Sequence, residues 1–281
     1  MKNKIMKMVK KYGEYITEGL ENPDKMLLTA SEEGLIDLVN RALDEGADTE
    51  TTDKDGWTPL LLSSFENHAD VVKELLERGA NTEAMDIEGL TPLIWASDKG
   101  YYQVVELLIK HGANIEAESK YTKETPLFSA CKGYKTKMVK LLLDDGAKIN
   151  ARDKFDNTPL IIASANGFDD IVKLLLGRGA DIDAKNTDNS SPLLLASQHG
   201  NVEVMRILIN RGANINVYGA ENNTCLDYES TWVWEVTKIQ ELIIALQPQN
   251  IKFFDDKIGI LPELKKKYKE VIEMSELGIF G

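Results

Sequence analysis

The sequence predicts an all-α fold, a solenoid made of stacked copies of one helix–turn–helix unit, and two spacings predict it. A Thr-Pro-Leu tripeptide, replaced once by Ser-Pro-Leu, recurs at intervals of 33, 34, 33 and 33 residues. A Gly-Ala dipeptide recurs at intervals of 33, 33, 34, 33 and 33 residues. Self-similarity at such a period is typical of arrays in which each unit buries its apolar face against its neighbours. The prolines are Pro59, Pro92, Pro126, Pro159 and Pro192, and the glycines are Gly46, Gly79, Gly112, Gly146, Gly179 and Gly212.

The first helix of each unit starts at the Thr-Pro-Leu tripeptide. Thr58 is a good N-cap because its hydroxyl can accept a hydrogen bond from a first-turn N–H, and Pro59 suits the first helical position because no donor is needed there. The segment PLLLSSFE supplies about two turns. Asn67 then occupies a position that is glycine in most units, and asparagine tolerates left-handed backbone, so we expect the turn to be kept.

The second helix carries Val71, Val72, Leu75 and Leu76 on one face at helical spacing, and Gly79 follows it as a C-terminal cap. One unit departs from this pattern. Its glycine, Gly133, comes one place early, and Tyr134 takes the usual glycine position. Acidic Asp144 and Asp145 precede its Gly-Ala, where four of the other units have a basic residue or histidine. We expect this unit to be locally the weakest.

The period near 33, the Thr-Pro-Leu start and the helix–turn–helix before Gly-Ala resemble the ankyrin repeat family, over residues 26–217. The resemblance implies short β-hairpin loops that project from one edge and form, with the first helices, a concave surface for protein partners. A seventh unit lacks Pro and the closing Gly-Ala and is expected to be a C-terminal cap. The expected units, about seven, are 26–52, 53–85, 86–118, 119–152, 153–185, 186–217 and 218–250.

The chain departs from the family pattern at the residue after Thr-Pro-Leu, which is usually His in the family. The sequence therefore predicts an apolar seam in place of a polar ladder between units. The residues at this position are Leu61, Ile94, Phe128, Ile161 and Leu194.

Candidate partner-binding residues come from the hairpins and from the first helices. Large apolar side chains in an exposed hairpin are unexpected unless a partner covers them, although they can also fold back onto the neighbouring hairpin. Offsets from the prolines centre the predicted groove on 54–66, 87–99 and 121–132. The hairpin candidates are Trp57, Ile87, Leu90, Tyr121 and Phe155, and the helix candidates are Phe65, Trp95, Asp98, Lys132 and His199, of which Trp95 is expected to be partly structural.

The two ends of the chain are predicted to be helical additions. Residues 1–25 combine helical apolar spacing with six lysines and are expected to cap the first unit. A membrane-surface helix is the alternative, which the acidic remainder of the chain disfavours. Residues 251–281 show a broken helical pattern, and either pack on the last unit or dock elsewhere, including on another copy.

Charge and motif content exclude several classes of function. A formal charge of −13 disfavours nucleic-acid and anionic-membrane partners and favours a protein with a basic or mixed patch. Asp53, Asp55 and Gly56 mimic part of a calcium loop, but a twelfth position at Leu62 lacks the required Glu, so the Asp and Gly are interpreted as a hairpin turn. His68, His111 and His199 are too far apart for a metal site and are expected to be solvated.

No catalytic motif or phosphate loop is present, and no cofactor is expected. Cys131 and Cys225 are interpreted as reduced and structural, and no secretory signal or membrane span is recognised. We therefore expect a cytoplasmic, monomeric, non-catalytic module that binds a protein partner as an adaptor, inhibitor or immunity-type protein. The alternatives are a secreted or host-directed effector, and an enzyme activity in the terminal extension.

Overall fold

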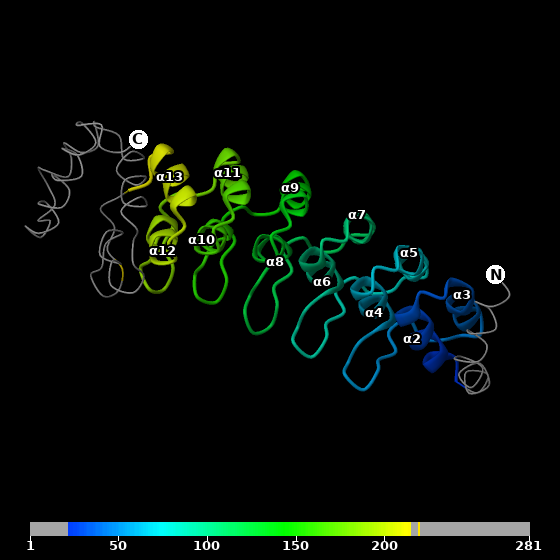
Figure 1. Ribbon diagram of the computed structural model, residues 1–281. Helices are drawn as coiled ribbons and strands as arrows, with labels where there is room; N and C mark the ends of the chain where they lie inside the picture. The colour runs from blue at the N-terminus through cyan, green and yellow to red at the C-terminus, as the bar shows by residue number, and fades with distance from the viewer. Residues whose placement is uncertain (1–21, 215–218, 220–281) are drawn as a thin grey trace, which may run out of the picture. The chain divides into compact units, whose positions relative to one another are not determined.

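The computed structural model describes residues 22–214 and 219, and every regular element among them is an α-helix (Figure 1). The chain divides into two compact units, Met1–Pro159 and Leu160–Gly281. The predicted all-α class is thus confirmed for the described residues. The first unit contains α2 (Pro23–Glu33), α3 (Ile36–Asp44), α4 (Pro59–Phe65), α5 (Ala69–Glu77), α6 (Pro92–Lys99), α7 (Tyr102–Lys110), α8 (Pro126–Lys132) and α9 (Thr136–Asp144).

The second unit contains four helices among the described residues. Helix α10 begins at Pro159, the last residue of the first unit, and continues into the second. The remaining segments expected from the sequence, namely 1–21 of the N-terminal cap, the seventh repeat apart from Gly219, and 251–281, lie outside the described residues. The helices are α10 (Pro159–Ala165), α11 (Asp169–Gly177), α12 (Pro192–Gln198) and α13 (Val202–Asn210).

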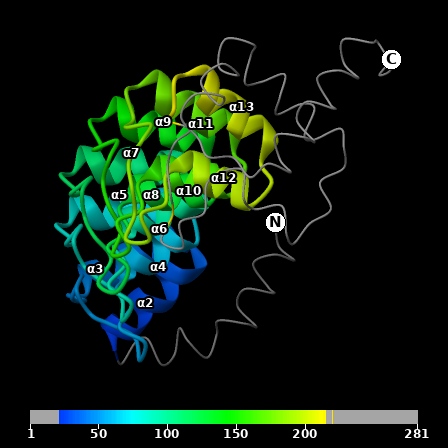
Figure 2. The same cartoon turned by 90° about the vertical axis from the view of Figure 1, so that its left-hand side faces the viewer.

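Helices of the first unit form two rows. Helix α2 contacts α4, α4 contacts α6 and α6 contacts α8, while α3, α5 and α7 form the second row beside them (Figures 1 and 2). The connections from each second helix to the next first helix leave the rows as long loops on the side of the first helices (Figure 1). None of the described helices is long and apolar enough to cross a bilayer.

Side-chain caps explain where the first helices start. The Thr58, Thr91 and Thr125 hydroxyls each accept a hydrogen bond from the backbone N–H three residues later, at 3.3 Å. Ser191 makes the same bond at 3.2 Å, which is why it can replace threonine. The opening helix has its own signal, since Asn22 accepts from the Lys25 N–H at 3.1 Å and Pro23 follows it. Helix α2 therefore begins before Met26.

The turn between the two helices of a repeat requires left-handed backbone. Asn67 has φ of 64° there, which confirms the expectation that asparagine preserves the turn. In the irregular repeat Tyr134 has φ of 55°, while Gly133 before it lies at φ of −80°. Left-handed backbone costs a residue with a Cβ about 1 kcal/mol or more, so the irregular repeat keeps its turn at the expense of strain at Tyr134.

The seam between neighbouring repeats is apolar where the sequence predicts it, with Leu61, Ile94 and Phe128 buried. A separate polar ladder, which the sequence did not indicate, lies away from this seam. Carboxylates at the base of one loop accept hydrogen bonds from backbone N–H groups of the next repeat, so the ladder runs through the loops and not through the helices. The pairs are Asn81 N to Glu50 at 2.9 Å, Asn114 N to Glu83 at 2.9 Å, Lys148 N to Glu116 at 2.7 Å and, in the second unit, Asn214 N to Asp183 at 2.8 Å.

One histidine takes part in the same kind of contact. The His68 ring, expected to be solvated, lies with Nε2 2.9 Å from the Glu32 carbonyl oxygen of the preceding repeat and packs against Gly34. In the second unit, the Asn201 amide donates to the Ser164 and Ala165 carbonyls at 2.9 and 2.8 Å from the equivalent position. The residue that precedes the second helix therefore joins neighbouring repeats.

Replacing Tyr134 with glycine should stabilise the protein. Tyr134→Gly removes the left-handed strain and is expected to raise the free energy of unfolding by about 0.5–1 kcal/mol in urea denaturation. Tyr134→Ala, which loses the same ring but keeps a Cβ, is the matched control and should show no gain. An equal gain in both variants would mean that the ring and not the backbone is the source of strain.

Removing one carboxylate of the ladder should weaken the contact between repeats. Glu83→Ala leaves the Asn114 N–H without its acceptor and is expected to lower the free energy of unfolding by about 1–2 kcal/mol. Glu106→Ala, on the exposed face of α7, serves as the control. If the two substitutions have the same effect on urea denaturation, the ladder does not stabilise the stack.

Candidate protein-binding surface

Three of the loops that leave the rows are hairpins closed by one aspartate side chain. In the loop 86–90, Asp86 Oδ1 accepts from the Glu88 and Leu90 N–H groups, both at 2.9 Å, and the Asp86 N–H donates to the Leu90 carbonyl at 3.2 Å. Asp53 and Asp153 close their loops in the same way. The hairpin interpretation of the Asp and Gly residues is therefore confirmed. Among the described residues, no group of three or more His, Cys, Asp or Glu side chains could hold a metal ion.

Neighbouring hairpins of the first unit lie against one another. Gly89 has φ of 75°, and a Cβ added to it would clash with Lys120 of the next hairpin. The irregular hairpin 119–124 has Ser119 in the place of the aspartate, and its hydroxyl accepts from the Glu124 N–H at 3.0 Å. The Lys154 N–H then donates to the Thr122 carbonyl at 2.9 Å, which links this hairpin to the following one.

Three consecutive hairpins carry a large exposed apolar side chain at the tip. Ile87, Tyr121 and Phe155 are 66%, 57% and 53% exposed, and we call these three residues the tip row. A lysine lies over each aromatic ring of the row. Lys120 Nζ is 5.3 Å from the Tyr121 ring centroid and Lys154 Nζ is 4.9 Å from the Phe155 centroid. The ammonium groups therefore flank the rings, which remain open to solvent.

Trp57, Phe65 and Trp95 form an aromatic cluster. The ring centroids of Trp57 and Phe65 lie 5.2 Å apart, those of Phe65 and Trp95 5.0 Å, and those of Trp57 and Trp95 5.6 Å. Lys99 Nζ lies 4.7 Å from the Phe65 centroid. Trp57, expected in an exposed hairpin, is thus half-buried, and its ring packs against Phe65 of α4 and Trp95 of α6.

Hydrogen bonding fixes the third ring of the cluster. The Trp95 Nε1–H donates to Asp86 Oδ2 at 2.9 Å, so one carboxylate both closes the hairpin 86–90 and orients the indole. This contact supports the expectation that Trp95 is partly structural. Its ring is still only half-buried, because one side borders a pocket.

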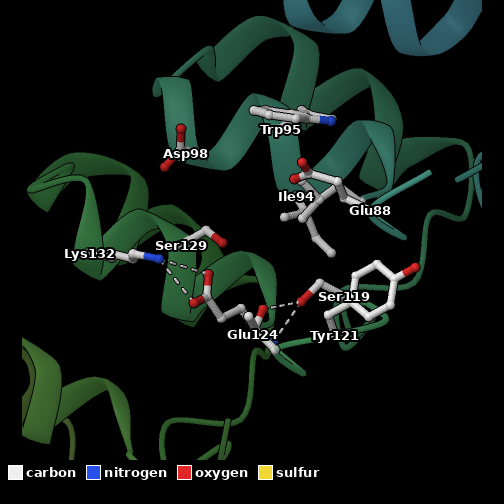
Figure 3. Close-up of a pocket in the computed structure, with 11 residues that line it drawn as sticks. Glu88, Ile94, Trp95, Asp98, Ser119, Tyr121, Glu124, Ser129 and Lys132 are labelled. Carbon is white, nitrogen blue, oxygen red and sulfur yellow. Dashed lines mark hydrogen bonds and ion pairs between the residues drawn. The ribbon is translucent and has the colours of Figure 1, made fainter. Parts of the chain in front are cut away.

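The pocket lies between the repeat of α6 and the repeat of α8 and has a volume of about 250 Å³ (Figure 3). Lys132 Nζ on one side lies 3.0 and 3.4 Å from the two carboxylate oxygens of Glu124. Trp95 forms the opposite side (Figure 3). Five of the partner-binding residues predicted from the sequence line this pocket: Leu90, Trp95, Asp98, Tyr121 and Lys132.

Sequence reasoning missed Asp86, which orients Trp95 in this surface, whereas Glu88 and Glu124 lie within the predicted groove segments 87–99 and 121–132. Asp86 had a signal, because Asp or Asn stands six residues before the proline in several repeats. His199 belongs to the second unit, where it is exposed and its Nδ1 lies 2.8 Å from the Leu195 carbonyl oxygen of its own helix. It does not line the pocket.

Cys131 has no reactive role in this surface. Its side chain is fully buried in α8, and burial raises the pKa of the thiol because the thiolate is poorly solvated there. This agrees with the expected structural thiol, while Cys225 lies outside the described residues.

Comparison with known proteins gives matches to repeat proteins. The family model described as "Ankyrin repeats (3 copies)" matches residues 27–119 and 116–186, and the model "Ankyrin repeat" matches residues 188–220. No curated protein sequence matches the chain.

Two solved structures illustrate the structural similarity. The human ASB11 ankyrin repeat domain is 26% identical with a TM-score of 0.70, and the match covers 79% of this chain and 98% of that one. The ankyrin repeat domain of Bcl-3, a member of the IkappaB protein family, is 28% identical with a TM-score of 0.68, covering 79% and 97%. With the family models matching well over half of its residues and the helix pairs stacked as described, the chain belongs to the ankyrin repeat family.

Proposed function

We propose that this protein is a non-catalytic module that captures a protein partner on the tip row and the adjoining pocket, as an adaptor, inhibitor or immunity-type protein. Ankyrin repeat domains are in general protein–protein interaction modules, which agrees with this proposal. One observation carries it. Ile87, Tyr121 and Phe155 stand exposed at the tips of three consecutive hairpins that pack side by side.

The tip row has the composition of an interface centre. Aromatic side chains lose little conformational entropy on binding and bury large areas, so a few of them dominate the affinity of many interfaces. Hairpins closed by Asp86 and Asp153 hold the tips in place before a partner arrives, which lowers the cost of ordering them on binding. Trp95 of the aromatic cluster lines the adjoining pocket.

Charge favours a partner with a basic or mixed patch. The formal charge of −13 attracts a basic protein at long range and accelerates its encounter with the surface. A protein that blocks or tethers its partner in this way requires no catalytic residue of its own. The net negative charge of the chain also disfavours nucleic acid, because phosphate contacts require cations.

Replacing the tip row should abolish partner capture without unfolding the chain. The variant Ile87→Ser, Tyr121→Ser, Phe155→Ser is expected to weaken binding of a partner isolated by affinity capture by about 100-fold, because it removes the apolar anchors. The affinity for the purified partner is measured by isothermal titration calorimetry, and circular dichroism checks the fold.

The matched control is Tyr102→Ser with Tyr134→Ser, which removes exposed aromatic rings from α7 and from the turn after α8. This control should change the affinity by less than about 3-fold, since neither ring lies on a hairpin. An unchanged affinity in the tip-row variant, or an equal loss in the control, would contradict the proposed surface.

A further inference from the structure

We infer that the pocket between the hairpins 86–90 and 119–124 binds an arginine side chain presented by the partner. The inference rests on the proposed function, because the arginine belongs to the segment that crosses the tip row.

The pocket carries more negative charge than its own residues neutralise. The pocket is lined by three carboxylates, from Glu88, Asp98 and Glu124, and by one ammonium, from Lys132. The Lys132 ammonium is engaged by Glu124. Glu88 and Asp98 make no side-chain hydrogen bond or ion pair with any residue in the part of the chain that the structure describes. A cation that enters the pocket would meet both of them.

The wall of the pocket suits a cation as well. Trp95 presents an indole held in one orientation by Asp86 and by the aromatic cluster, and the pocket opens beneath it between Glu88 and Asp98 (Figure 3). An ammonium of the chain already lies near this ring, with Lys99 Nζ 5.7 Å from the Trp95 centroid. The ring therefore takes part in a cation–π contact without a partner, and a second cation on the pocket side would make the same contact.

Size and geometry favour arginine among the possible occupants. The volume of about 250 Å³ is below the roughly 300–1,000 Å³ typical of small-molecule sites, so one side chain fits better than a cofactor. Guanidinium is planar, stacks on aromatic rings and presents several donors to carboxylates, whereas the lysine ammonium is a strongly hydrated point charge. An arginine can therefore contact Trp95, Glu88 and Asp98 together.

An NMR titration of the full chain tests the pocket directly. The probe is N-acetyl-arginine amide, compared with the neutral isostere N-acetyl-citrulline amide, and the reporter is the Trp95 indole N–H signal, assigned with Trp95→Phe. We expect saturable shifts at about millimolar concentrations of the arginine probe, at least about 5-fold weaker binding of citrulline, and weaker arginine binding at high salt.

Variants locate the binding site of the probe. Glu88→Gln with Asp98→Asn should reduce arginine binding at least about 5-fold, while the control Asp70→Asn with Glu106→Gln, which changes exposed carboxylates on α5 and α7, should leave it unchanged. Equal shifts with citrulline, no saturable shift, or no loss in the pocket variant would overturn the inference. Indole shifts that depend on protein concentration without a probe would assign the pocket to a second copy of the chain and would also overturn it.

Selection of peptides from a random displayed library separates this inference from the proposed function. We expect peptides that share an arginine, lose binding to the tip-row variant and lose binding to the pocket variant. Peptides that depend on the tip row but share no arginine and bind the pocket variant normally would overturn the inference alone. Arginine-dependent indole shifts without any selected peptide would count against the proposed function and leave the arginine pocket standing.

Discussion

The contact between neighbouring repeats is the constraint on which the first unit depends. A single pair of short helices cannot bury Leu60 or Leu93, so these side chains become buried only because α4 and α6 pack side by side. The carboxylates of Glu50 and Glu83 fix the same spacing at the base of the loops. Since both the helices and the loops are held at one repeat distance, residues at equal or nearly equal offsets become neighbours in space. Ile87 and Tyr121 stand five residues before their prolines and Phe155 stands four before its own, which brings the three into the tip row.

The surface is ordered by the contacts that build the stack. Asp86 closes its hairpin and also holds the Trp95 indole, so the backbone of the tip and the wall of the pocket are fixed by one carboxylate. Glu124 in the next hairpin engages Lys132, which leaves Asp98 without a cation of its own among the described residues. A partner that binds the proposed surface would require little rearrangement of it, because the exposed groups are already in place.

Local rules predicted much of this arrangement from the sequence. Thr-Pro-Leu predicts where the first helices start, and Asn67 predicts a turn. The offsets from the prolines predict that Leu90, Trp95 and Tyr121 lie in one groove, and all three line the pocket. What could not be predicted depends on side-chain rotamers and on the neighbouring repeat: the packing of Trp57 onto Phe65 and the carboxylate ladder. The Asn22–Pro23 start was a readable N-cap signal, but it lies outside the Thr-Pro-Leu pattern.

A crystal structure of the chain bound to its partner tests the central claim most directly. The account predicts that one continuous partner segment covers Ile87, Tyr121 and Phe155 and places a side chain against Trp95. A partner seated on the second helices α5, α7 and α9, with the three hairpin tips still exposed to solvent, would contradict it.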